Sequence, residues 1–162
     1  MAVLVAYATR QGAVRGVAER IAEMLRDQDF LVDLRRLSGY ETLAGYDAVV
    51  MGSAVYSSDW LGEATMSATR NAAALAGRPL WTFSVGRLCD VDEVRPPVSG
   101  RGHRFFVVSS FEREVFRSAG GRCGGFRDWP EIDTWAYGIA EGIDRAVDRR
   151  TTRPLLMAGS GS

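Results

Sequence analysis

Short apolar segments alternate with segments of helical periodicity along this chain, and that alternation constrains its fold more than any other feature. Strands that alternate with helices form parallel sheets that helices cover on both faces. The sequence therefore predicts an α/β fold, a doubly wound five-stranded parallel sheet with strand order 2-1-3-4-5. The predicted strands are residues 2–7, 30–37, 46–55, 79–85 and 103–110, and the predicted helical faces span residues 14–25, 61–75 and 132–147.

The length of the chain, 162 residues, suits one domain. Hydrophobic residues make up 46% of it, which is enough to fill a core. No repeat and no linker divides the alternating pattern. We expect the domain to occupy residues 1–150 and residues 151–162 to form a disordered tail.

Charge and composition argue against several classes of function. Lys plus Arg and Asp plus Glu number 20 each, so the net charge gives no general attraction to nucleic acid or to an anionic membrane. One histidine and two cysteines without a close pair motif do not make a zinc site, and no metal is expected. Neither a signal peptide nor an integral membrane segment is visible. These features predict a cytoplasmic protein.

Three loops should meet where the predicted strands end, at residues 8–13, 53–60 and 84–89. Ligands of doubly wound sheets bind at this edge. The first loop leads into a helix N-terminus, where free N–H groups and the helix dipole favour an anion. Thr9 offers a hydroxyl there, and Gly12 allows a close backbone approach. The same residues are equally consistent with an ordinary strand-to-helix turn capped by Thr9.

Three stretches carry a resemblance to a known family, namely YATRQG in the first loop, YDAVVMGSAVY in the third strand and FRDWPEIDTWAYGIAEGI at the last helix. Their order and spacing resemble the flavodoxin-like family, and within it the flavodoxin-domain proteins similar to menaquinone-dependent protoporphyrinogen oxidase. The resemblance spans Val3 to about Val147. It implies a flavodoxin-like fold and non-covalently bound FMN. It also implies that the phosphate sits on the first loop and the isoalloxazine ring between the other two.

By position in these motifs, the resemblance implies cofactor-binding residues in all three loops. The phosphate would be held by Thr9, Arg10, Gln11, Gly12, Ala13 and Val14. One side of the ring would meet Ser53, Ala54, Val55 and Tyr56, with Trp60 nearby, and its other edge would meet Ser84, Val85, Gly86 and Arg87. Tyr56 or Trp60 can stack on a flavin. Trp60 is almost as well explained as a packing residue at the start of its helix.

Two departures from the family pattern bear on function. Flavodoxin phosphate loops commonly have a threonine where this chain has Val14. The protoporphyrinogen oxidase branch has a long insertion after the fifth strand, whereas residues 109–128 are few and rich in glycine. The sequence therefore does not predict quinone or porphyrin substrates.

Three functions follow from the sequence. The leading hypothesis is an FMN-dependent oxidoreductase of unknown substrate and unknown catalytic residues, with a small-molecule or protein redox partner. A flavin-free binding or assembly module is an alternative that Val14 keeps open. An electron-shuttle flavodoxin is a second alternative, which the zero net charge disfavours because such carriers are typically acidic. The sequence does not predict an oligomeric state.

Overall fold

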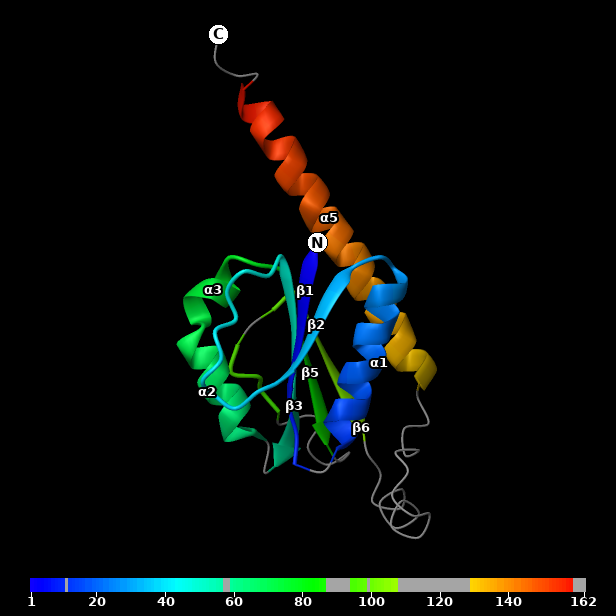
Figure 1. Ribbon diagram of the computed structural model, residues 1–162, viewed down its shortest axis with the longest axis vertical. Coiled ribbons are helices and arrows are strands. Elements are labelled where there is room, and N and C mark those ends of the chain that lie inside the picture. Colours follow the sequence, from blue (N-terminus) through cyan, green and yellow to red (C-terminus); the bar gives the residue numbers. More distant parts are fainter. Residues whose placement is uncertain (11, 57–58, 87–93, 99, 108–128, 159–162) are drawn as a thin grey trace.

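A computed structural model describes residues 1–10, 12–56, 59–86, 94–98, 100–107 and 129–158, except for the side chains of residues 107 and 150–158 (Figure 1). The elements are β1 (Ala2–Ala8), α1 (Ala13–Asp27), β2 (Leu31–Arg36), β3 (Ala48–Tyr56), β4 (Asp59–Trp60), α2 (Gly62–Arg70), α3 (Ala72–Ala76), β5 (Leu80–Gly86), β6 (Gly102–Val107) and α5 (Trp129–Ala158). The backbone of α5 extends past residue 150, and the predicted division into a domain and a disordered tail stays a prediction.

The sheet confirms the predicted topology. Its strand order is β2-β1-β3-β5-β6 with every neighbouring pair parallel, which for these five strands counted along the chain is 2-1-3-4-5. The short strand β4 pairs antiparallel with the end of β3. The register places Ala8 beside Ser53 and Ser53 beside Ser84. The carboxyl ends of β1, β3 and β5 therefore meet at one edge, at the lower end of the sheet in Figure 1.

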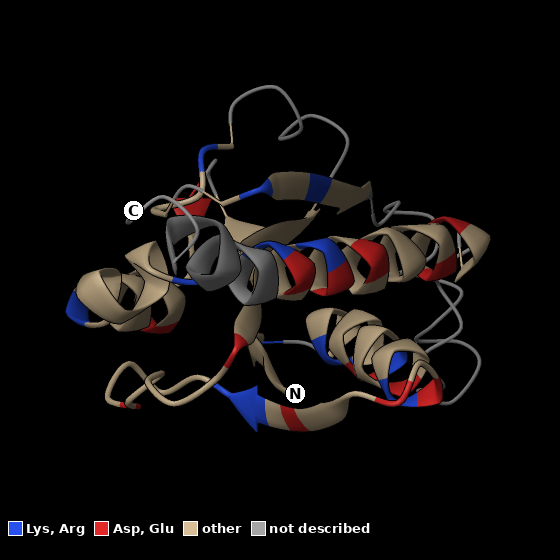
Figure 2. Ribbon diagram, turned by 90° about the horizontal axis from the view of Figure 1, so that it is seen from above, with Lys and Arg blue, Asp and Glu red and all other residues tan. Residues whose placement is uncertain are grey.

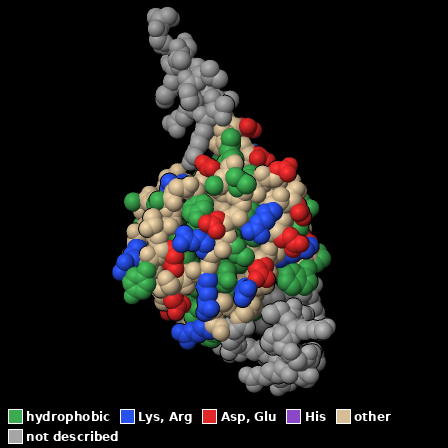
Figure 3. All heavy atoms as spheres, viewed as in Figure 1, with side chains coloured by type: hydrophobic (Ala, Val, Ile, Leu, Met, Phe, Trp, Pro, Cys, Tyr) green, Lys and Arg blue, Asp and Glu red, His purple; other side chains and the backbone are tan. Residues whose placement is uncertain are grey.

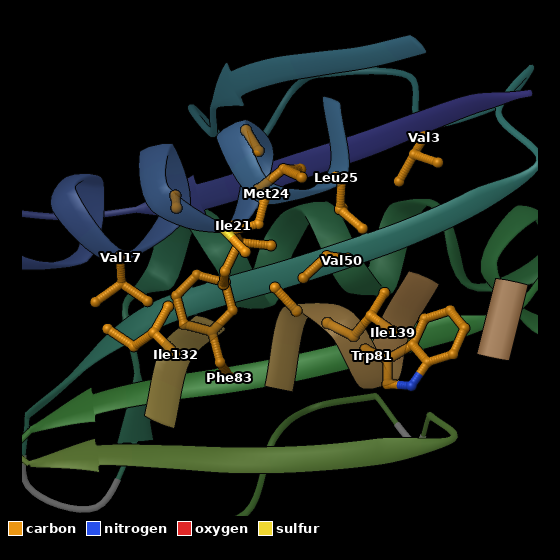
Figure 4. Close-up of a cluster of buried hydrophobic side chains, with 14 of the residues drawn as sticks. Val3, Val17, Ile21, Met24, Leu25, Val50, Trp81, Phe83, Ile132 and Ile139 are labelled. Carbon is orange, nitrogen blue, oxygen red and sulfur yellow. The ribbon is translucent and has the colours of Figure 1, made fainter. Parts of the chain in front are cut away.

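Alternate side chains of the buried strands enter two separate cores, as parallel strands covered on both faces require. Helices α1 and α5 cover one face, and α2 and α3 cover the other (Figure 1). In the first core, Phe83 of β5 lies among Val17 and Ile21 of α1 and Ile132 of α5 (Figure 4). The strands that carry the predicted loops are thus fixed from both sides.

The predicted helix over residues 61–75 is two helices, α2 and α3, which is a correction to the sequence prediction. Asn71 separates them, and its side chain bonds both to α2 and to the loop before β3. Its Oδ1 accepts from the backbone N–H of Leu43 at 2.9 Å, and its Nδ2 donates to the carbonyl oxygens of Glu41 at 2.9 Å and Ser67 at 2.8 Å. The interruption thus accompanies hydrogen bonds to the loop before β3.

Acidic and basic residues are interspersed on the surface, as the zero net charge suggests. They alternate along the helices in Figure 2, and the face seen in Figure 3 mixes both signs. None of the helices in the described part of the chain combines the length and apolar character needed to cross a membrane.

Candidate functional site

The backbone of the first loop is compatible with an anion site at a helix N-terminus, and also with a turn that Thr9 closes. Gly12 precedes α1 with a φ of 83°, a left-handed conformation that side chains disfavour. Its backbone N–H donates to Oγ1 of Thr9 at 3.1 Å. A Cβ added at Gly12 would meet nothing within 4 Å. The first turn of α1 contains no acidic residue. The junction is therefore open, and no acidic side chain in that turn opposes an anion.

Val14 does not face this opening, because its side chain is 1% exposed and packs in the core beneath α1. The hydroxyl that the family commonly has at this position is replaced by an apolar core contact. Val14 and Ala13 can serve an anion only through their backbone N–H groups, which belong to the first turn of the helix. Gln11 lies outside the described residues.

Arg36 also reaches the first loop, although it was not among the predicted cofactor-binding residues. The β1–β2 register pairs Arg36 with Tyr7, and its Nη2 donates to the carbonyl oxygen of Thr9 at 3.2 Å. A guanidinium thus lies beside the loop and adds positive charge to its surroundings. The residue could be found only from the strand register, since its neighbour Arg35 looks the same in the sequence.

Tyr56 ends β3 and presents a partly exposed ring beside the first loop. The side chain is 38% exposed, and the guanidinium carbon of Arg10 lies 5.4 Å from the ring centroid. This is the geometry of a cation–π contact. The structure therefore brings residues of the first and second predicted loops together, with an aromatic face at their junction.

Other residues of the second loop are buried and support it from within. Ser53 is fully buried, and its Oγ accepts from the backbone N–H of Leu61 at 3.0 Å and donates to the carbonyl oxygen of Ala54 at 2.8 Å. Val55 is 6% exposed and pairs with Trp60 across the β3–β4 ribbon. These contacts fix the path of the chain after β3.

Trp60 packs in the interior and joins the second loop to the third. Its side chain is 5% exposed, and its indole Nε1 donates to Oγ of the fully buried Ser84 at 2.8 Å. Packing, and not a free stacking face, is therefore the role of Trp60 in this conformation. Val85 is also buried and Gly86 is partly exposed at the end of β5, while Arg87 lies outside the described residues.

His103 extends this polar contact across the sheet. Its Nε2 lies 3.3 Å from Oγ of Ser84, and its Nδ1 lies 2.8 Å from Oγ1 of Thr82. Desolvation lowers the pKa of His103 below its usual value, against the opposing effect of a hydrogen bond with the backbone of Thr82.

A hollow of about 480 Å³ lies at the opposite end of the strands from these loops. Arg78, Arg101 and Arg149 line it, together with the start of β5. It contains none of the predicted cofactor-binding residues.

Comparisons with known proteins agree with this arrangement. The sequence family described as the flavodoxin domain matches residues 4–117. Among solved structures, rubredoxin oxygen:oxidoreductase from Desulfovibrio gigas is similar, with 14% identity and a TM-score of 0.62 over 90% of this chain and 37% of that one. The chain thus corresponds to well under half of that protein's length. Flavodoxin 2 from Bacillus cereus has 19% identity and a TM-score of 0.59 over 88% of this chain and 99% of its own.

A short-chain flavodoxin associated with a PDU bacterial microcompartment is also similar, with 13% identity and a TM-score of 0.59 over 88% of this chain and 99% of its own. Similarity at these identities shows a shared fold. No curated protein sequence matches the chain.

Proposed function

The chain belongs to the flavodoxin-domain family, and we propose that it binds FMN non-covalently and serves in a flavin-dependent redox reaction. The observation that carries the proposal is the junction of β1 and α1. It combines a left-handed glycine, open space above that glycine and a helix N-terminus at the edge where ligands of such sheets bind.

The phosphate of FMN would be held mainly by the backbone. The N–H groups of Ala13 and Val14 open the first turn of α1, and Gly12 leaves room for close approach. Arg10 and Arg36 add positive charge beside the loop. The side chain of Val14 is buried in the core. Its lack of a hydroxyl therefore does not affect the backbone N–H groups that would bind the phosphate.

The ring would lie against residues of the second and third loops. Tyr56 is the aromatic side chain with an accessible face, whereas Trp60 supports the loops from the buried side. Bound FMN would supply the redox chemistry by accepting and releasing electrons at its ring. The residues of this chain bind the cofactor, orient it and limit its contact with water.

The redox partner is a small molecule or a protein, and no nucleic acid is involved, because the mixed surface charge favours neither nucleic acid nor a strongly basic partner. We also propose that the chain is related to the protoporphyrinogen oxidase branch of the family, but we do not propose the substrates of that branch. We place the protein in the cytoplasm.

Titration of the purified protein with FMN and with riboflavin tests the proposal. Riboflavin has the same ring and lacks the phosphate. A working phosphate site contributes charge-assisted hydrogen bonds of about 1.5–3 kcal/mol each, so FMN should bind roughly 10- to 100-fold more tightly. Equal affinities would leave the first loop as a structural turn. A protein that binds neither flavin would favour the flavin-free binding or assembly module.

A further inference from the structure

One chain of polar contacts joins the two loops that would flank the ring to the only histidine of the sequence. Trp60 belongs to the second loop and Ser84 opens the third, and the indole Nε1 of Trp60 donates to Oγ of Ser84 at 2.8 Å. Nε2 of His103 lies 3.3 Å from the same hydroxyl oxygen. Ser84 is fully buried, so bulk water does not compete for the bond between Trp60 and Ser84, whereas His103 at the end of this chain is itself exposed.

The direction of one of these hydrogen bonds is fixed, and it favours a direction for the other. An indole N–H can only donate, so Ser84 Oγ accepts from Trp60. The hydroxyl of Ser84 has one proton to donate, and among the hydrogen bonds of the described residues Nε2 of His103 is the acceptor within its reach, so we assign Nε2 as the acceptor. In a neutral imidazole the other nitrogen carries the proton, so Nδ1–H faces Thr82, whose Oγ1 lies 2.8 Å away.

Protonation of His103 would reverse one of these bonds. Both ring nitrogens of an imidazolium donate, so Nε2 could no longer accept from Ser84. Oγ of Ser84 would then face two donors, from Trp60 and from His103, and its proton would lose its acceptor within the network. A buried hydroxyl without an acceptor costs about 1–3 kcal/mol. The arrangement that links the second and third loops is therefore more stable with neutral His103 than with charged His103.

We propose that His103 is a positioning residue for flavin binding, which acts through Ser84 to make the arrangement of the two ring-flanking loops depend on its protonation state. The inference rests on the proposed function, because the consequence concerns FMN. With neutral His103 the link from Trp60 to Ser84 is complete and the loops hold their positions. When His103 becomes charged the link is disturbed, and the affinity for FMN falls.

Neighbouring charges do not oppose this behaviour. Desolvation sets the pKa of His103 below its usual value of about 6.5, so the neutral form prevails at neutral pH. The charged residues on the adjoining described segments are Asp59 of β4, Arg95, Arg101 and Arg104, and none of them contributes to that shift.

The network itself can be tested on flavin-free, ¹⁵N-labelled full-length protein. Because the chain has one histidine, its two imidazole nitrogen signals need no further assignment. We expect the Nδ1–H tautomer at pH 7.5 and a pKa below about 6.5. Free histidine favours the Nε2–H tautomer, so the result discriminates. An Nε2–H tautomer would overturn the proposal, whatever the protein does with flavin.

The coupling to flavin requires FMN dissociation constants between pH 5 and pH 8 for the wild type and for His103→Gln. The phosphate of FMN titrates near pH 6 in both proteins, so the ratio of the two constants isolates His103. We expect wild-type affinity to fall at least threefold relative to His103→Gln as pH drops through the measured pKa. Ser84→Ala should abolish this relative change, while Arg101→Gln, which removes a nearby exposed charge, should keep it.

The outcomes separate the two proposals. Tight FMN binding with a constant ratio between wild type and His103→Gln would overturn the role of His103 and leave the proposed function intact. Absence of FMN binding at every pH would overturn both the proposed function and the role of His103 in it, and the tautomer measurement would still report whether the network exists.

Discussion

Arg20 of α1 and Asp133 of α5 form a two-pronged ion pair although 113 residues separate them in the sequence. Nε of Arg20 donates to Oδ1 of Asp133 at 2.7 Å, and Nη2 donates to Oδ2 at 2.8 Å. Both side chains are only partly exposed, at 36% and 25%. The pair fastens together the two helices that cover one face of the sheet.

A double-mutant cycle with Arg20→Ala and Asp133→Ala should give a coupling energy of about 1 kcal/mol at pH 7 and low salt. Exposed ion pairs usually contribute less, but two parallel hydrogen bonds strengthen this one. The hydrogen bond with Arg20 lowers the pKa of Asp133. The stability that the ion pair contributes is therefore fully present above about pH 3.9, the pKa of aspartate in the unfolded chain. It is lost as the pH falls through the lower pKa that Asp133 has in the folded protein. Urea unfolding at pH 7 and pH 2.5 measures both effects. A coupling unchanged at pH 2.5 would contradict this account.

Glu41 should contribute to stability through its hydrogen bonds with Ser38, Gly39 and Ser67. Burial alone would raise the pKa of this carboxyl group, but the hydrogen bonds from Ser38 and Ser67 outweigh it and lower the pKa to about 2. The depressed pKa means that this stability is full above the unfolded value of about 4.3 and disappears as pH falls toward 2.

We expect Glu41→Gln to reduce the free energy of unfolding at pH 7 by about 1–2 kcal/mol, after allowance for solvent screening. The difference from wild type should shrink below pH 4. Glu141→Gln is the matched control, because that carboxylate is 71% exposed and should change stability by less than about 0.5 kcal/mol. Equal effects of the two substitutions would mean that the loop before β3 is not held by Glu41.

Gly52 cannot accept a side chain without displacing the core. A Cβ there would lie 2.1 Å from Cζ of Phe83, a ring that is fully buried. Gly52→Ala should therefore cost about 1–3 kcal/mol or more, as overpacking does. Gly138→Ala in α5 is the control, since a Cβ there meets nothing within 4 Å and should stabilise the helix by up to about 1 kcal/mol. Thermal unfolding of both variants measures these changes in stability. An unchanged stability of Gly52→Ala would contradict the close contact between Gly52 and Phe83.

Gly12 and Gly45 allow a matched test of the phosphate site. Both have positive φ, 83° and 93°, and both have open space around an added Cβ. Alanine at either position should cost a similar amount of stability, about 1–2 kcal/mol. Only Gly12→Ala should also reduce the preference for FMN over riboflavin, because only Gly12 opens α1. The measurement is the dissociation constant of FMN and of riboflavin for each variant. An equal loss of the preference for FMN in both variants would mean that the phosphate does not bind at Gly12.

The alternation of apolar strands and helices was enough to predict the sheet and its strand order, because burial on both faces leaves a strong local signal. The break at Asn71 could not be read in the same way, since the side chain is held by Leu43 and Glu41, which are distant in sequence. The pairing of β4 with β3 was likewise not predicted.

In the candidate site, too, some features could be predicted from the sequence and others depend on contacts between residues distant in sequence. Strand ends correctly suggested which loops meet, and Gly12 was recognisable from the sequence. The two interpretations of Trp60 could be separated only by its burial and its hydrogen bond to Ser84. Arg36 reaches Thr9 through strand register, and His103 reaches Ser84 across neighbouring strands, so neither carried a sequence signal of its own.

The pairing of α1 with α5 has a consequence for how the chain folds during synthesis. The face of the sheet that carries Trp81, Phe83 and Phe106 is covered by α1, near the start of the chain, and by α5, which is synthesised after all the strands that the structure describes. Until residues 129–147 have left the ribosome, α1 alone can pack against these aromatic side chains. A nascent chain that exposes them is prone to aggregate. We therefore expect release of α5 to be the step that completes folding, and chaperones to bind the chain just before it.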